Sequence, residues 1–113
     1  MANTNTLRSA SSSQLTGADR QRVLVGIPCL NEEKTIAAVI QSIPREIQGI
    51  SRVDIVVVDD GSDDRTGEIA RQHGAKVIRH PHRRGLGRAF DSIVQHALTH
   101  GYDVMVRAHV CVV

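Results

Sequence analysis

Two adjacent carboxylates, Asp59 and Asp60, stand directly before Gly61 and Ser62, and the apolar run IVVV at residues 55–58 precedes them. A carboxylate here can accept a hydrogen bond from a ring N–H of uracil or from the N–H edge of guanine, and such a charged bond is strong where water is excluded. Gly61 would let the backbone approach a ligand. Ser62 could hold the turn or touch a ribose. These residue types indicate a site that recognises a ligand.

The same acids have a plainer interpretation, in which Asp59 and Asp60 cap the following helix and face water. However, Asp63 and Asp64 follow so closely that they suffice for capping. We therefore favour recognition of a ligand over capping.

The apolar run indicates where the acids lie in the fold. Residues 55–58 are apolar at every position, which is typical of a strand covered on both faces in a parallel sheet flanked by helices. In open sheets of this kind, ligands bind just beyond the carboxyl ends of the strands. The acid pair is therefore expected at the ligand-binding edge of the sheet.

Strand and helix patterns alternate along the chain. We expect strands at 22–27, 53–58, 76–79 and 103–106, and helices at 33–42, 65–73 and 86–100. Pro28 is expected to stop the first strand, Asn31 to cap the first helix, and Ser62 or Asp63 to cap the second. The last helix carries apolar residues at helical spacing that should face the core: Phe90, Ile93, Val94, Ala97 and Leu98. The alternation predicts an α/β fold with a Rossmann-like parallel sheet.

Length and composition limit what the chain can be. It has 113 residues and a net charge of +2, enough for one small domain. Residues 1–20 are rich in Ser, Thr and Asn, so we expect a disordered arm there, neither a secretory signal nor a membrane anchor, with the domain over 21–113. No apolar run is long enough to form a transmembrane segment.

Aromatic residues and cysteines narrow the function further. The only aromatic residues are Phe90 and Tyr102, which argues against nucleic acid as a partner. Cys29 and Cys111 lack the spacing of a metal site, and reduced thiols of this kind are typical of a cytoplasmic protein.

Three other families with acidic or glycine-rich sites fail at named positions. A haloacid-dehalogenase phosphatase needs an Asp two residues before the second acid, where Val58 stands. A response-regulator receiver needs its acidic pair after the first strand and an Asp at a later strand end, but here the pair follows the second strand and no Asp follows Val106. A dinucleotide site needs GxGxxG directly after the first strand, where PCL stands at 28–30.

Three motifs together resemble one family. They are IPCLNE at 27–32, VVVDDGSDDRT at 56–66 and RGLGRA at 84–89. In this order and spacing they resemble the inverting glycosyltransferases of family 2, most of all the polyprenyl-phosphate branch that includes dolichyl-phosphate mannose synthase. The resemblance covers residues 22–106 and implies the N-terminal, nucleotide-binding part of a GT-A fold. The implied parent reaction transfers a sugar from a UDP- or GDP-linked donor to an acceptor such as a polyprenyl phosphate.

The resemblance also implies roles for residues near the first two strand ends. Pro28, Leu30 and Glu32 would line the nucleotide pocket, with Glu32 at the ribose. Asp60 would recognise the base, with Asp59 in support. For Glu32 a second interpretation, as negative charge at the N-terminus of the following helix, stays open.

A further set of residues is implied near the diphosphate. The resemblance places Arg84, Gly85 and Gly87 there, where a helix N-terminus and basic groups favour anions. For Arg84, together with Arg83, a solvated run of charge is an equally good interpretation.

The sequence departs from the family after Val106. The family places an Asp-x-Asp motif there, whose carboxylates hold Mg²⁺ or Mn²⁺ against the diphosphate. The corresponding positions carry His109 and Cys111, whose imidazole and thiolate suit softer metals. We therefore expect no metal site and no catalytic residue in this chain, and no transfer activity by the chain alone, although complete family members would use Mg²⁺ or Mn²⁺.

The loss of the pattern after Val106 also predicts a truncation, a frameshift or a mispredicted gene end in the coding sequence. An alternative function is a non-catalytic module that binds a nucleotide or associates with another protein. Self-association would use the exposed sheet edge expected at residues 103–113.

The histidines are expected to have no special role. His96 and His100 are one helical turn apart but lack a third metal ligand, so we expect both to be exposed on the last helix. His80 and His82 flank Pro81 and are expected on the surface.

Overall fold

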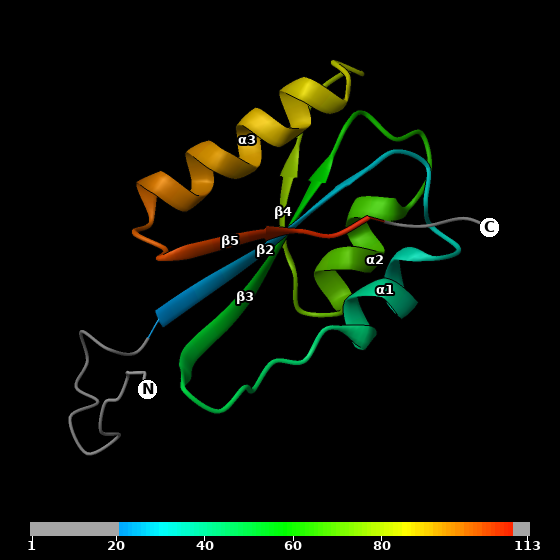
Figure 1. The fold of residues 1–113 in the computed structure, drawn as a ribbon. Coiled ribbons are helices and arrows are strands. Elements are labelled where there is room, and N and C mark those ends of the chain that lie inside the picture. Colours follow the sequence, from blue (N-terminus) through cyan, green and yellow to red (C-terminus); the bar gives the residue numbers. More distant parts are fainter. Residues whose placement is uncertain (1–20, 110–113) are drawn as a thin grey trace.

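The computed structural model describes residues 21–109 as parallel strands alternating with helices (Figure 1). The elements are β2 (Gln21–Cys29), α1 (Ile36–Ser42), β3 (Ile50–Asp59), α2 (Thr66–Gln72), β4 (Lys76–Arg79), α3 (Leu86–Thr99) and β5 (Val104–Arg107). The arm expected at 1–20 and the residues from Val110 onward, Cys111 included, lie outside the described residues. The predicted strand–helix alternation is confirmed.

The strand order defines where a ligand would bind. The sheet has the order β4-β3-β2-β5, and all of its pairs are parallel. The chain first steps from β2 outward to β4 and then returns to the other side of β2 with β5, so the connections reverse between β2 and β5. In open α/β sheets the crevice beyond the carboxyl ends at such a reversal is the usual ligand site.

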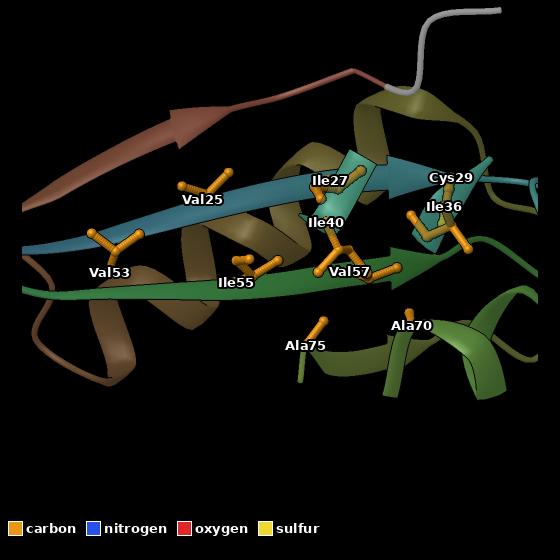
Figure 2. Close-up of a cluster of buried hydrophobic side chains, with 10 residues drawn as sticks. All are labelled: Val25, Ile27, Cys29, Ile36, Ile40, Val53, Ile55, Val57, Ala70 and Ala75. Atoms are coloured by element: carbon orange, nitrogen blue, oxygen red, sulfur yellow. The ribbon is translucent and has the colours of Figure 1, made fainter. Parts of the chain in front are cut away.

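Helices cover both faces of the sheet, as the apolar run predicted. Successive side chains of β2 and β3 alternate between the faces. Figure 2 shows the cluster on the face of α1 and α2, which comprises Val25, Ile27, Cys29, Ile36, Ile40, Val53, Ile55, Val57, Ala70 and Ala75. The face of α3 holds a second cluster, made of Leu24, Val56, Val58, Ala89, Ile93 and Ala97.

Pro28 does not stop the first strand, contrary to prediction. β2 continues through Pro28, which pairs with Val58, to Cys29. The Cys29 carbonyl accepts the Asp60 N–H on the β3 side, so the nitrogen of Pro28 faces the β5 side. β5 pairs with β2 only as far as Gly26. The N–H that proline lacks is therefore not needed by the sheet.

The predicted helix caps are also wrong. The residues at the cap positions of α1 and α2 are Thr35 and Arg65, and neither makes a side-chain cap hydrogen bond. Both helices begin later than predicted, because the polar side chains before them accept hydrogen bonds from backbone N–H groups of the opposite loop instead. These bonds shape the candidate site described below.

Helix α3 packs through a narrower stripe than its sequence pattern predicted. Ala89, Ile93 and Ala97 are buried at intervals of four residues, whereas Leu98 is 71% exposed. Leu98 lies about 100° around the helix from Ala97, which turns it away from the sheet. Within residues 21–109, none of the helices combines the length and apolar character that crossing a membrane requires.

Candidate functional site

The two acids at the end of β3 point to opposite faces of the sheet, because side chains alternate along a strand. Asp59 continues the row of Val57, towards α2, and Asp60 continues the row of Val58, towards α3. Both carboxylates are buried, with 0% of Asp59 and 6% of Asp60 exposed. Although the two carboxylates are adjacent in sequence, they therefore contact different parts of the fold.

Asp59 organises the turn that follows β3. Its Oδ1 accepts a hydrogen bond from the Ser62 N–H at 2.9 Å, and its Oδ2 accepts one from Nη1 of Arg79 at 2.7 Å. Arg79 in turn donates from Nη2 to the Ser62 carbonyl at 2.9 Å. Asp59 thus fixes the end of β3 without facing the cavity described below.

Asp60 holds the loop between β4 and α3. Its Oδ1 accepts hydrogen bonds from Nδ1 of His80 at 2.7 Å and from the Arg84 N–H at 2.9 Å, and its Oδ2 accepts the Gly85 N–H at 2.9 Å. Burial alone would raise the pKa of Asp60, but these hydrogen bonds outweigh it and hold the pKa below its ordinary value. At neutral pH the side chain is therefore ionised and can only accept hydrogen bonds.

A cavity of about 200 Å³ opens between the end of β2 and the start of α3. Its walls comprise Pro28, Cys29, Leu30, Glu32, Asp60, Arg83, Gly85, Leu86 and Ala89. The structure thus brings together most of the residues that the sequence analysis selected. Those are Pro28, Leu30, Glu32, Asp60 and Gly85.

Three selected residues, Asp59, Arg84 and Gly87, are not in the cavity wall. Arg84 contributes its backbone N–H to Asp60, while the residue lines a separate hollow along α3 with Arg88. Gly87 lies in the first turn of α3, and open space surrounds the position where its Cβ would be.

Sequence reasoning missed four wall residues: Cys29, Arg83, Leu86 and Ala89. The first strand pattern was expected to end before Pro28 and so left Cys29 out, and RGLGRA indicated a loop entering a helix. Neither pattern distinguishes Arg83 from Arg84, since the direction of each side chain depends on how Asp60 holds the loop. Arg83 is the arginine at the cavity.

The loops after β2 and β3 are bound directly to each other. The Asn31 N–H donates to Oγ of Ser62 at 2.8 Å, and the Asp63 N–H returns a bond to Oδ1 of Asn31 at 2.9 Å. The Glu32 N–H donates to Oγ1 of Thr66 at 2.8 Å. These bonds use the groups that had been expected to cap α1 and α2, and they hold Glu32 in place before any ligand binds.

The surroundings of Glu32 bear on its two interpretations. The Glu32 carbonyl accepts the N–H of Ile36, where α1 begins. Glu32 therefore stands just before the first turn, which contains no acidic residue, and not within it. Its carboxylate accepts the Thr35 hydroxyl at 3.3 Å and lines the cavity. The position therefore favours contact with a ligand.

The predictions for the histidines are partly wrong. His80 is only 4% exposed and lies between Asp60 and Ser92. Ile78 packs on the α3 face, so the two-residue period would have placed His80 on that same face. His100 is exposed as predicted, whereas His96 is partly buried.

The described residues do not fit a divalent metal ion. Among residues 21–109, no group of three or more His, Cys, Asp or Glu side chains could hold one. The rings of His96 and His100 lie 4.1 Å apart between centroids, but no third ligand joins them. Of the two residues at the expected Asp-x-Asp positions, His109 is exposed and Cys111 lies outside the described residues.

Comparisons of the sequence with known proteins agree on one family. The profile of Glycosyl transferase family 2 matches residues 24–106. An uncharacterised protein of Methanocaldococcus jannaschii is 36% identical over 95 residues, which is 84% of this chain and 37% of that protein. The 4,4'-diaponeurosporenoate glycosyltransferase of Staphylococcus haemolyticus is 44% identical over 61 residues, which is 54% of this chain and 16% of that enzyme.

A solved structure shares the fold. Glucosyl-3-phosphoglycerate synthase from Mycobacterium tuberculosis, crystallised with UDP, superposes with a TM-score of 0.64 at 30% identity. The match covers 82% of this chain and 35% of that enzyme. Other crystals of the synthase contain Mn²⁺ with UDP or with UDP-glucose. The chain therefore spans well under half the length of the proteins it matches.

Proposed function

The chain belongs to glycosyl transferase family 2, and on that premise we propose that residues 21–109 bind the nucleotide part of a nucleotide sugar. The observation that carries this proposal is the ionised carboxylate of Asp60 in the wall of the cavity at the end of β2. It is a hydrogen-bond acceptor with a fixed orientation, which is what recognition of a base N–H requires.

The hydrogen bonds already made by Asp60 favour uracil. Oδ1 accepts two hydrogen bonds, from His80 and Arg84, whereas Oδ2 accepts one, from Gly85. Because a carboxylate oxygen has two lone pairs, Oδ2 keeps one acceptor position. Uracil presents a single ring N–H to such a position, whereas guanine presents two neighbouring donors that would need both oxygens. We therefore propose a UDP-linked donor, and the UDP complexes of the M. tuberculosis synthase support this choice.

The remaining wall residues suit the rest of the nucleotide. Glu32 would accept hydrogen bonds from the ribose hydroxyls, and Pro28 and Leu30 would contact the nucleoside. The diphosphate would lie towards Arg83 and the start of α3, where Gly85 at the N-cap position provides no side-chain cap. The free N–H groups of a helix start attract anions. The positions of Gly85 and Gly87 face open space, which leaves room for that approach.

The parent reaction would transfer the sugar from this donor to an acceptor. The described residues do not fit the divalent metal that such a transfer would use, so we propose that they bind the donor without completing the reaction. A transfer or hydrolysis assay of the purified chain with UDP-glucose tests this, and metal-dependent turnover would contradict it. The polyprenyl-phosphate acceptor and the cytoplasmic location stay predictions.

Association through the sheet edge is the second candidate function. β5 is the outermost strand next to β2 within the described residues, and Val106 on it is 46% exposed. An unpaired strand edge with an exposed apolar side chain can add a strand from another chain. Light scattering over a concentration series tests this candidate. A monomer at all concentrations would rule it out.

Calorimetric titration of the chain with UDP tests the first candidate. We expect binding by the unaltered chain and its loss in Asp60→Asn, since the amide offers a different hydrogen-bonding pattern. Asp63→Asn is the matched control, because Asp63 is exposed and its carboxylate makes no hydrogen bond to the described residues. Equal weakening by both substitutions, or no binding by the unaltered chain, would contradict the proposal.

A further inference from the structure

His80 is buried at a point where three elements meet. It directly follows β4, and its N–H donates to the Asp59 carbonyl at 2.9 Å, which extends the pairing of β3 and β4 by one residue. Its side chain turns towards α3 and is almost fully removed from solvent. It is absent from the wall of the cavity, so it is close to the candidate site without facing it.

Both ring nitrogens of His80 have partners. Nδ1 lies 2.7 Å from Oδ1 of Asp60, and Nε2 lies 2.9 Å from Oγ of Ser92 on α3. Because an ionised carboxylate can only accept, Nδ1 carries the proton that joins it to Asp60. A hydrogen bond to a charged group with both partners buried is among the stronger ones in a protein.

These bonds close a ring of contacts around the start of α3. Asp60 binds His80 and the N–H of Gly85, the residue that precedes α3. His80 also binds Ser92, in the second turn of the same helix. The start of the helix is therefore tied to the ends of β3 and β4 at two points. His80 makes the second contact itself and binds the carboxylate that makes the first. Loss of the imidazole would leave Asp60 with only the Arg84 and Gly85 N–H bonds, both from the loop that it has to hold, and would weaken the orientation of its carboxylate.

We propose that His80 is a positioning residue for nucleotide recognition. Without touching the nucleotide, it orients the Asp60 carboxylate and fixes the start of α3, so that Oδ2 of Asp60 and the backbone of Gly85 keep their places in the cavity wall. This inference rests on the proposed function. It adds a residue that neither the three sequence motifs nor the cavity wall includes.

Substitutions at His80 separate positioning from simple packing. His80→Leu fills the space but removes both hydrogen bonds. His80→Asn keeps an N–H donor where Nδ1 stands and loses the contact with Ser92. His82→Leu is the matched control, because His82 is exposed in the same loop. Two measurements apply to each variant: the Kd for UDP by calorimetry, and the hydrogen-exchange rates of the Arg84 and Gly85 amides by NMR.

We expect His80→Leu to raise the Kd for UDP about tenfold or more, which is the scale of one hydrogen bond to a charged group. His80→Asn should stay within about threefold of the unaltered chain, because the bond to Asp60 is retained. The Arg84 and Gly85 amides should exchange faster in His80→Leu than in His80→Asn. His82→Leu should change neither quantity.

Two results would overturn the proposal. One is equal weakening of UDP binding by His80→Leu and His80→Asn, since a donor at Nδ1 would then not matter. The other is unchanged exchange of the Arg84 and Gly85 amides in His80→Leu. The exchange measurement needs no ligand, so it tests the positioning role even if UDP does not bind. Failure of the proposed function and failure of this inference are thereby distinguished.

Discussion

Gly61 and Arg83 pack backbone against backbone, so that a Cβ built on Gly61 would lie only 2.7 Å from the Arg83 nitrogen. This contact joins the loop after β3 to the loop before α3, which carry two of the three sequence motifs. Gly61 also has a φ of +85°, a conformation that residues with a Cβ rarely adopt. The glycine of the DDGS sequence is thus required for how the loops pack.

Replacing Gly61 with alanine should lower stability for both reasons. We expect a loss of about 1–3 kcal/mol from the steric overlap, added to about 1–2 kcal/mol from the left-handed backbone. Gly49→Ala is the matched control, because Gly49 has a φ of +86° but no atom within 4 Å of its Cβ position. Urea unfolding of both variants measures the difference. Equal losses would show that the contact with Arg83 is unimportant.

A second glycine, Gly26 in β2, allows α3 to approach the sheet. A Cβ there would lie 2.4 Å from Cγ2 of Ile93, which is fully buried. We expect Gly26→Ala to cost about 1–3 kcal/mol of stability through overpacking. Ile93→Ala removes the atoms that the new Cβ would meet, so the double variant should be more stable than the sum of the two single losses predicts. Strictly additive losses in urea unfolding would contradict this packing.

Acid should destabilise the fold through its hydrogen-bonded carboxylates. The pKa values of Asp54, Asp60 and Asp64 are lowered, because hydrogen bonds outweigh the burial that alone would raise them. When the pKa of a carboxyl is lower in the folded than in the unfolded state, the group stabilises the fold at any pH above its unfolded-state pKa of about 3.9. This contribution is lost as the pH falls through the folded-state pKa. The free energy of unfolding should therefore fall steeply below about pH 4.

The Asp64→Asn variant tests the source of this acid sensitivity. Asp64 accepts the N–H groups of Thr66 and Glu33, and asparagine has no proton to gain. We expect a shallower loss of stability in this variant when urea unfolding is repeated at decreasing pH. A slope identical to that of the unaltered chain would mean that other groups cause the loss.

Cys29 should be unreactive in the folded chain. Burial raises the pKa of its thiol to about 12, and the nearby Asp59 carboxylate adds to the rise. Since the thiolate is the reactive form, iodoacetamide at about pH 8 should leave Cys29 unmodified in the native chain and alkylate it in urea. Mass spectrometry of the peptide that contains Cys29 measures this. Rapid alkylation of the native chain would contradict the buried position.

Most of the fold could be predicted from local patterns, but the contacts between loops could not. The apolar run at 55–58 and the spacing of Ile93 and Ala97 correctly indicated a buried strand and a packed helix. Local cap preferences failed because Asn31 bonds to Ser62, across a separation of 31 residues. A contact of that kind depends on how two strand ends are placed, which no short motif specifies.

For the candidate site, too, local motifs predicted some residues correctly, whereas contacts between loops could not be predicted. The motifs selected Asp60 and Glu32, which do line the cavity. They did not distinguish Arg83 from Arg84, because that depends on the hydrogen bonds that hold the loop. His80 was missed because the proline after it suggested a surface loop, although its position two residues after Ile78 placed it on the α3 face.

The central claim is that Asp60 recognises a base through a ring N–H, and the relative affinity of the unaltered chain for UDP and CDP tests it most directly. The two nucleotides share ribose and diphosphate, but cytosine has no N–H at the ring position where uracil has one. Calorimetric titration should show UDP binding about tenfold or more tightly than CDP, since cytosine would leave two acceptors facing each other. Equal affinities for UDP and CDP would contradict the claim.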